Sequence, residues 1–260
     1  MIDLHCHIIF GVDDGPINET ESLAMMKKAV EDGITTIVAT PHHLNERYVN
    51  EREQILPRVK QLNELARVNN LNLRIVPGQE VRLYHDIVAD YLKKKIVTIG
   101  DNTQYLLVEL PFHFLPSSTA YIFSQLQNEG LTPIIAHPER NAGFMDQPEK
   151  LIELVENGVL TQLTASSIVG DFGKKVQALC YQMIEANAVH VIASDAHHVT
   201  NRSFKMQEAL HLLKKRYGAA YPHALLKNAE SILANKKCTS FNTIPPQIKA
   251  KRFFDRFKKS

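Results

Sequence analysis

The chain opens on MIDLHCHIIFGVDDG (residues 1–15), which places two histidines and a pair of adjacent aspartates close together at the start of the sequence. Residues 1–4 alternate apolar and polar side chains, which predicts a short β-strand. His5 and His7 lie two positions apart at its end, so on an extended segment both imidazoles point the same way and can bind one metal ion. The DDG triplet then provides carboxylates in a turn that can fold back toward them.

Strand-like and helix-like segments alternate along the rest of the chain. Apolar or β-branched runs, each followed by an amphipathic segment, predict seven strand-then-helix units. The expected strands are residues 1–4, 34–40, 71–76, 105–110, 132–136, 159–164 and 189–193. The expected helices are residues 22–31, 51–69, 86–95, 117–129, 148–157, 173–186, 203–217 and 222–235. Strict alternation without hairpin signals or a Gly-rich phosphate fingerprint favours a closed or distorted parallel α/β barrel over a doubly wound sheet.

Composition is that of an ordinary globular chain, with 260 residues, 44% of them hydrophobic, and a formal net charge of +2. This near-neutral net charge does not indicate nucleic-acid binding, which is typical of strongly basic proteins. The three cysteines are unevenly spaced and form no CxxC pair, which argues against a disulfide framework or a zinc ribbon. We expect Cys6 to face away from the neighbouring histidines and to pack in the core. Without a signal peptide or a membrane-spanning apolar run, the chain is expected to be cytoplasmic.

The positive charge is concentrated near the C-terminus. Residues 247–260 contain six Lys or Arg and one Asp, with Ile248 and three phenylalanines between them. We therefore divide the chain into one barrel domain, residues 1–243, and a basic tail, residues 244–260. The tail is either a solvated end or a segment that docks on an acidic partner or an anionic membrane surface.

Metal-capable side chains follow nearly every expected strand. Parallel strands of a barrel all end on one face, so these side chains are expected to form one cluster there. The candidates, with an aspartate of the DDG turn, are His5, His7, Asp14, His42, Glu80, Glu109, His137, Asp195 and His197. Nine candidates are too many for one ion, and closely spaced carboxylates repel one another unless cations lie between them. The mixture of imidazole and carboxylate suits Mn, Fe or Zn, which predicts a cluster of two or three divalent ions.

The motifs HCH, DDG, ATPHH, GQE, VEL, AHPER and SDAHH, in this order, resemble those of the PHP family of phosphoesterases. More closely, residues 1–233 resemble the manganese-dependent tyrosine phosphatases of capsule and exopolysaccharide loci, the CpsB/CapC type. The resemblance implies a distorted (β/α)7 barrel with three metal ions. Mn²⁺ is the expected metal, and Fe, Mg or Zn could take its place. It also implies hydrolysis of phosphotyrosine on a bacterial tyrosine kinase and its substrates, by attack of a metal-bridging hydroxide on phosphorus.

The same resemblance assigns ligands to each ion. It implies a first ion held by His5, His7, Glu80 and Asp195, a second by Glu80, Glu109 and His137, and a third by Asp14, His42 and His197. Arg140 and Arg202 would then clamp the phosphate oxygens, which suits the planar guanidinium fork. Arg47 is a further candidate for phosphate binding, although a solvated loop cation explains it equally well. For Arg140 the alternative is a structural ion pair with Glu139.

Two other functions are alternatives to this one, and a third, a thiol-based phosphatase, is excluded by the sequence. A thiol-based phosphatase needs an arginine six positions after its cysteine, and Val12, Ala186 and Ile244 occupy those positions here. A small-molecule phosphoesterase of the histidinol-phosphatase kind would share the barrel and the metals. A non-catalytic barrel would have lost ligands, whereas none of the nine candidate positions departs from the motif pattern.

Overall fold

The computed structural model describes residues 1–238, so the expected boundary after residue 243 and the basic tail lie outside the described residues. All strand pairs in the described part are parallel. One sheet has the order β1-β2-β4 and the other β3-β5-β6-β7-β8-β9. The bounds are β1 Ile2–Cys6, β2 Thr36–Ala39, β3 His42–His43, β4 Arg74–Pro77, β5 Glu80–Arg82, β6 Tyr105–Glu109, β7 Thr132–Ala136, β8 Leu160–Thr164 and β9 Val191–Ala193.

The two sheets form one closed ring. Strand β3 continues β2 after a two-residue break, and β5 continues β4 in the same way. Strands β1 and β9 meet at the remaining gap, where His7 N–H donates to the carbonyl oxygen of Ala196 (2.9 Å) and Asp195 N–H donates to that of His5 (2.8 Å). If β2–β3 and β4–β5 are each counted as one interrupted strand, seven strands close a distorted barrel. The predicted fold class is confirmed.

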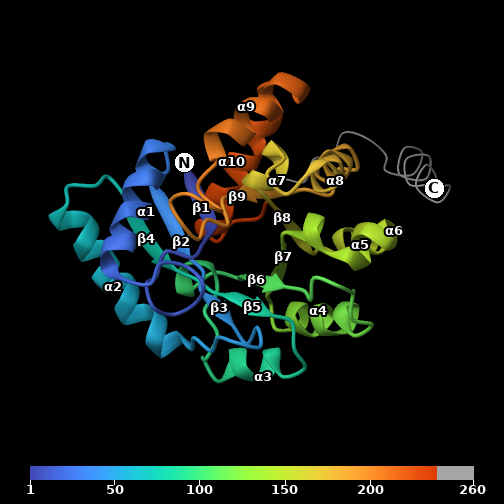
Figure 1. Cartoon of the computed structure of the whole chain (residues 1–260). Coiled ribbons are helices and arrows are strands. Elements are labelled where there is room, and N and C mark those ends of the chain that lie inside the picture. Colours follow the sequence, from blue (N-terminus) through green and yellow to red (C-terminus); the bar gives the residue numbers. More distant parts are fainter. Residues whose placement is uncertain (239–260) are drawn as a thin grey trace.

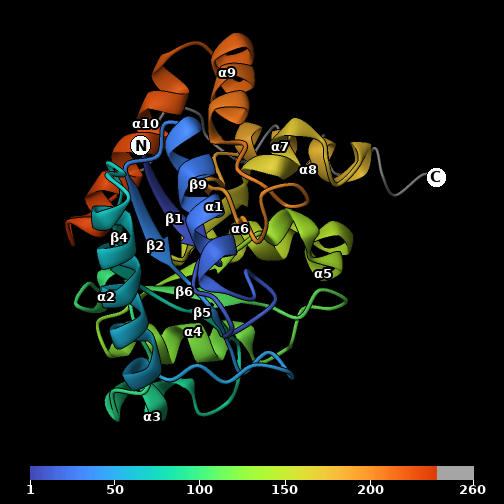
Figure 2. The same ribbon diagram turned by 60° about the vertical axis from the view of Figure 1, so that its left-hand side comes forward.

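Helices surround the strands on the outside (Figure 1). After a turn of the view, α1 and α2 still lie side by side along β1, β2 and β4, with α3 and α9 at opposite ends (Figure 2). The helices are α1 Glu19–Glu31, α2 Arg52–Val68, α3 Ile87–Leu92, α4 Thr119–Asn128, α5 Ala142–Asp146, α6 Pro148–Glu156, α7 Ala165–Val169, α8 Lys174–Glu185, α9 Met206–Tyr217 and α10 Ala220–Leu233. Two 3-10 turns, η1 Ile99–Asp101 and η2 Pro138–Arg140, complete the described elements.

Capping residues set the starts of the first helices. The Asn18 side chain accepts the N–H of Glu21 (3.0 Å) and so caps α1. At α2, Glu51 and Gln54 form a reciprocal capping box. The predicted helices are all present, whereas the short helices α5 and α7 were not predicted, because five residues are too few to show a helical period.

Strand side chains alternate between two apolar clusters. Tyr105 and Leu107 of β6 belong to the cluster that also holds Ile232 of α10, and Leu106 and Val108 belong to the larger cluster formed with the outer helices. This alternation is the two-residue period of a strand buried on both faces. No helix within residues 1–238 is long and apolar enough to cross a membrane.

Candidate metal centre

The alternation of the strands points the candidate ligands into the barrel mouth. On β6, Tyr105 and Leu107 face the interior, and Glu109 is next in the same period. His42, Glu80 and Asp195 each lie four positions after an interior valine, namely Val38, Val76 and Val191. With a period of two residues, their side chains are on the same side as these valines. Since every strand ends at this side of the barrel, the side chains converge there.

Two departures from regular strand geometry direct His5, His7 and His137 into the barrel mouth. The register of β1 shifts between Asp3 and Cys6, so that Leu4 packs in the interior cluster and Cys6 in the outer one. His5 and His7 then point into the mouth, and the expected packing of Cys6 is confirmed at 0% exposure. His137 directly follows interior Ala136 and adopts a left-handed backbone conformation, with φ of 36°.

All nine candidates lie in one continuous cluster, and only Asp14 is substantially exposed. Three sets of ligand atoms lie within 4.8 Å of one another in the described part of the chain: His7, Asp14, His42 and His197; His5, His7 and Glu80; and His42, Glu80 and Glu109. Asp195 adjoins the second set, with its Oδ1 3.4 Å from Nε2 of His5 and 3.5 Å from Nε2 of His7. These sets overlap those implied by the resemblance, and the assignment of each ligand to an ion stays a prediction.

The second implied set differs from the geometry at one residue. The structure groups His42 with Glu80 and Glu109, with His42 Nδ1 2.8 Å from Oε2 of Glu80. His137 instead lies 2.7 Å from the other oxygen of Glu80, Oε1. Glu80 therefore lies between imidazoles on both of its oxygens, which suits a carboxylate shared by more than one ion.

Two residues that the sequence analysis did not select orient the first histidines. His5 donates from Nδ1 to Oε1 of Gln162 (2.8 Å), and His7 donates from Nδ1 to Oδ2 of Asp13 (2.7 Å). Both Nε2 atoms are thereby left facing the cluster, 3.1 Å from each other. Such partners fix the tautomer and the ring direction of a metal-binding histidine. The Asp13 carboxylate was visible in the DDG motif, whereas nothing around Gln162 in the sequence pointed to this role.

The turn that holds Asp13 is packed tightly against the end of β1. Asp13 Oδ1 accepts the N–H of Gly15 (3.0 Å), and Oδ2 also accepts the N–H of His42 (3.1 Å). A Cβ atom on Gly15 would collide with the carbonyl oxygen of His7. Glycine is therefore required at this position for the turn to reach the cluster.

Strong mutual interactions among the buried groups perturb their titration. Burial, and then the charge of Glu80, raise the pKa of Glu109 to about 7. Burial opposes charge on Asp195 too, but Arg140, His5 and Arg202 outweigh it and hold its pKa well below the usual range. Two charged carboxylates as close as Glu80 and Glu109, within 4.8 Å of each other, repel by at least roughly 3.5 kcal/mol at an effective dielectric constant of 20. A divalent cation between them would replace this repulsion by attraction.

The residues present fit divalent cations of the predicted kind. Buried Nδ1 of His42, Nε2 of His197 and an oxygen each of Glu80 and Glu109 make no hydrogen bond of regular geometry among the described residues, although His42 Nδ1 and Glu80 Oε2 lie only 2.8 Å apart. Buried polar atoms are rarely left so, and these belong to residues that the structure groups as possible ligands: His42 with Glu80 and Glu109, and His42 with His197. Imidazole nitrogens and carboxylate oxygens, without a thiolate, form the donor set expected for Mn, Fe or Zn.

Two of the three predicted arginines lie at the cluster. Arg140 Nη2 lies 2.5 Å from Oδ2 of Asp195, and Arg202 Nη2 lies 3.2 Å from both Asp195 oxygens. The Arg140 guanidinium is also flanked by two phenyl rings, with its Cζ 5.7 Å from the centre of the Phe112 ring and 5.0 Å from that of Phe172. These contacts hold a rigid cationic fork beside the metal-ligand candidates.

Other cations and histidines near the motifs have different environments. Arg47 is exposed in the segment after β3. Arg82, which the sequence analysis did not select, follows Glu80 by two positions and brings Nη2 to 3.5 Å from Oε2 of Glu109. His43 is buried and its Nδ1 accepts the N–H of Asn50, whereas His198 is exposed.

A dense group of buried nitrogen and oxygen donors at the mouth of a parallel barrel, bordered by guanidinium groups suited to phosphate oxygens, defines a metal-dependent hydrolase. Comparison with known sequences gives the particular family. Residues 1–234 match the model of the capsular polysaccharide synthesis family CpsB/CapC, and the chain belongs to this family.

Individual relatives match most or nearly all of the chain. Tyrosine-protein phosphatase YwqE of Bacillus subtilis is 41% identical over 257 residues, covering 99% of this chain and 100% of the relative. Tyrosine-protein phosphatase CpsB of Streptococcus pneumoniae is 34% identical over 227 residues, covering 84% of this chain and 92% of the relative. The expected family and enzyme class, a tyrosine-protein phosphatase, are confirmed by these matches.

Solved structures agree with the sequence comparison. A structure described among those of YwqE and CpsB, "unique metal-dependent tyrosine phosphatases", superposes with a TM-score of 0.91, covering 94% of this chain and 99% of the other at 41% identity. A β-aspartyl dipeptidase of Fervidobacterium islandicum has a TM-score of 0.54 at 15% identity, covering 94% of this chain and 78% of the other. The second likeness shows the fold alone.

Proposed function

We propose that this chain is a manganese-dependent phosphatase that removes phosphate from tyrosine residues of a bacterial tyrosine kinase and its substrates, and so regulates capsular or exopolysaccharide synthesis. The observation that supports this most directly is the cluster of nine buried or half-buried ligand candidates beside Arg140 and Arg202. Its place in a chain 41% identical to a tyrosine-protein phosphatase gives the substrate class.

The nine candidates would hold two or three divalent cations, Mn²⁺ by preference, with Fe, Mg or Zn able to replace it. When bound, such cations activate water and neutralise charge on a phosphate ester. His5 and His7 would present unprotonated Nε2 atoms, because Gln162 and Asp13 accept from their Nδ1 atoms.

Arg140 and Arg202 would bind the phosphate oxygens of the substrate. The side chain of Arg202 is 33% exposed and lies between Asp14 and Asp195, so it can reach a group that enters from solvent. Arg140 is more buried, at 10% exposure, and its guanidinium lies against the rings of Phe112 and Phe172. A cationic fork fixed before the substrate arrives loses little entropy on binding and stabilises charge on phosphorus-bound oxygens.

The tyrosine oxygen is a tolerable leaving group, since a phenol has a pKa of about 10. For this reason the proposal needs no dedicated general acid among the side chains. Arg47 stays a candidate for binding the substrate outside the cluster, because its side chain is exposed on the segment that follows His42. The cytoplasmic location and the membrane-proximal role of residues 244–260 stay predictions.

The test compares phosphate release from a phosphotyrosyl peptide and from histidinol phosphate. Metal-stripped protein is assayed with and without added Mn²⁺, alongside Arg140→Lys and Arg202→Lys, which keep the charge but lose the fork. Arg67→Lys is the matched control, because Arg67 pairs with Glu64 on the exposed face of α2. We expect Mn²⁺-dependent release from the peptide, reduced at least about tenfold in the two site variants and unchanged in the control.

Other outcomes would support the alternatives. Faster release from histidinol phosphate would keep the barrel and metals but replace the protein substrate by a small phosphate ester. No release from either compound, with Mn²⁺ still bound, would indicate a non-catalytic barrel.

A further inference from the structure

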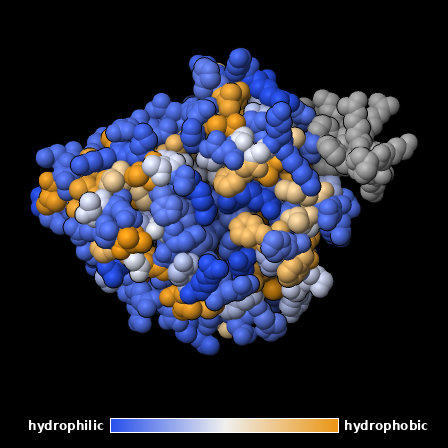
Figure 3. All heavy atoms as spheres, in the orientation of Figure 1, coloured by the Kyte–Doolittle hydropathy of each residue, from blue (hydrophilic) through white to orange (hydrophobic). Residues whose placement is uncertain are grey.

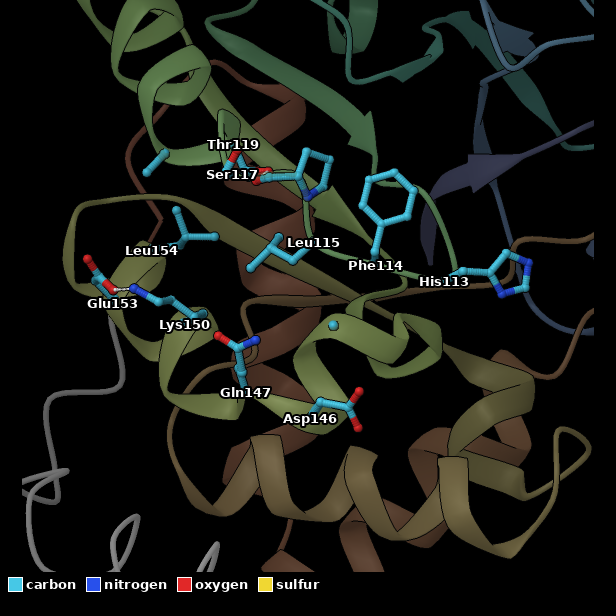
Figure 4. Close-up of a pocket in the computed structure, with 13 residues that line it drawn as sticks. His113, Phe114, Leu115, Ser117, Thr119, Asp146, Gln147, Lys150, Glu153 and Leu154 are labelled. Carbon is cyan, nitrogen blue, oxygen red and sulfur yellow. Dashed lines mark hydrogen bonds and ion pairs between the residues drawn. The ribbon is translucent and has the colours of Figure 1, made fainter.

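A cavity of about 530 Å³ lies beside the metal centre, between the segment that leads into α4 and the helices α5 and α6 (Figure 4). Both apolar and polar side chains line it. Its lining consists of His113, Phe114, Leu115, Pro116, Ser117, Thr119, Ala120, Gly143, Asp146, Gln147, Lys150, Glu153 and Leu154. The volume is within the range of pockets that bind small ligands.

The wall of the cavity is physically continuous with the metal centre. Phe112 directly precedes the lining segment, and its ring stacks on His137, with ring centres 5.4 Å apart and an angle of 15° between the planes. The carbonyl oxygen of Phe112 accepts the N–H of Ala142 (2.8 Å). The Asn141 side chain donates to the carbonyl oxygens of Pro111 (2.6 Å) and Phe114 (3.3 Å). The segment is therefore fastened to the turn that contains Arg140.

The short sequence separation between Arg140 and the cavity lining limits the distance between the two sites. Gly143 lines the cavity and follows Arg140 by three residues, so their Cα atoms are at most about 11 Å apart. An extended peptide advances about 3.3 Å per residue. A polypeptide whose phosphotyrosine meets Arg140 can thus place a side chain two to four residues away in the cavity.

Two exposed phenylalanines lie in the segment between the two sites. Phe112 is 39% exposed and Phe114 is 57% exposed, and in Figure 4 the Phe114 ring lies between the cavity and His113, which points away from it. In the space-filling view, apolar residues gather to the right of the middle of the face, next to hydrophilic ones (Figure 3). Single exposed apolar side chains are common, but here two of them lie in the segment that joins the metal centre to the cavity, which favours a binding surface there.

We propose that this cavity is a subsite for an apolar side chain of the phosphorylated polypeptide, two to four residues from the phosphotyrosine. The inference rests on the proposed function. Leu115, Pro116 and Leu154 would contact the apolar side chain, and Phe112 and Phe114 would border the path of the peptide between the subsite and the metal centre. Asp146, Gln147 and the Lys150–Glu153 ion pair (2.9 Å) provide donors and acceptors for the peptide backbone.

The test uses a set of phosphotyrosyl peptides in which a single leucine is moved through positions −4 to +4 in an otherwise serine-rich sequence. Each is assayed with Mn²⁺-loaded full-length protein, together with p-nitrophenyl phosphate, which cannot reach the cavity. We expect leucine at one position two to four residues from the phosphotyrosine to raise kcat/KM at least about tenfold over serine.

The variant Ala120→Trp fills the cavity from the first turn of α4, where Ala120 is exposed. The matched control is Ala220→Trp, because Ala220 is also exposed and lies in the first turn of α10. We expect the ratio of kcat/KM for the leucine peptide to that for the serine peptide to fall to about one in Ala120→Trp and to stay high in the control. Thermal unfolding checks that both variants fold.

The outcomes separate this proposal from the proposed function. Hydrolysis of all peptides without a leucine preference, or a preference that survives in Ala120→Trp, would overturn the subsite alone. Hydrolysis of p-nitrophenyl phosphate but of no phosphotyrosyl peptide would overturn the proposed function. A native dimer that Ala120→Trp converts to a monomer would show that a second copy of the chain covers the cavity, which would also overturn the subsite.

Discussion

Replacing Asp13 by asparagine tests whether this carboxylate orients His7 as a ligand of the proposed metal centre. The Asp13 side chain is 1% exposed and its two oxygens accept three hydrogen bonds, from Nδ1 of His7 (2.7 Å) and from the N–H groups of Gly15 (3.0 Å) and His42 (3.1 Å). An amide has one acceptor oxygen and one NH₂ group, which donates. Either orientation of the introduced amide therefore sets its NH₂ group against at least one donor, with little change in size.

The expected magnitude follows from the role of the lost partner. Removing the hydrogen-bond acceptor of a metal-binding histidine costs about 10-fold to 100-fold in metal affinity, which corresponds to about 1.4–2.7 kcal/mol. Calorimetric titration of the metal-stripped variant with Mn²⁺ measures this directly. We expect weaker binding by that factor and a parallel loss of phosphatase activity at limiting Mn²⁺, recovered in part at high Mn²⁺.

Asp171→Asn is the matched control, because Asp171 is exposed after α7 and the substitution removes the same charge. It is expected to bind Mn²⁺ as the native chain does. If Asp13→Asn bound Mn²⁺ within twofold of the native affinity, the hydrogen bond to His7 would not orient a metal ligand, and this account of the site would be wrong.

Three further predictions concern stability. Burial lowers the pKa of His190 to about 4, below the unfolded value of 6.5, so the unfolded chain takes up the proton first and up to about 3 kcal/mol is lost as the pH falls from 6.5 to 4. Urea unfolding of His190→Gln should show a weaker loss over this range, and an identical pH profile would contradict the assignment. Adding Mn²⁺ at about 100 times its Kd should raise the free energy of unfolding by about 2.7 kcal/mol, seen as a Tm about 5–10 °C higher than with a chelator, whereas an unchanged Tm would argue against binding to the folded chain. The Tyr105 hydroxyl donates to the carbonyl oxygen of Lys236 (2.7 Å), so Tyr105→Phe should cost about 0.5–1.5 kcal/mol in urea unfolding, and a neutral result would show that this bond contributes nothing net.

The strands and long helices were accessible from the sequence because each depends on a local period. Residues 105–109 and 132–136 are short apolar runs that end at a metal-capable side chain, and the structure has β6 and β7 there. The short helices α5 and α7 and the 3-10 turn η2 were not predicted, since three to five residues do not show a period. Their positions depend on contacts made elsewhere, such as the hydrogen bonds from Asn141 to the segment before α4.

The candidate site divides in the same way. Strand-end histidines and carboxylates could be selected because all parallel strands of a barrel end on one face. Arg82 and Gln162 could not, because each contributes only through a partner far away in the sequence: Arg82 approaches Glu109, and Gln162 accepts from His5. The sequence also could not predict that His42 lies with Glu80 and Glu109. The direction of a side chain at a strand end depends on the local backbone conformation, which the sequence pattern does not give.

The sequence by itself determined the donor atoms, their order along the chain and the barrel that gathers them, because residue chemistry and strand period are local properties. Only the tertiary structure decided which donors share a position. The register shift in β1 aims His5 and His7 inward, the left-handed backbone of His137 turns its ring onto Glu80, and the closed turn at Gly15 brings Asp13 to His7. Each of these depends on packing between segments distant in the sequence, which no local pattern encodes.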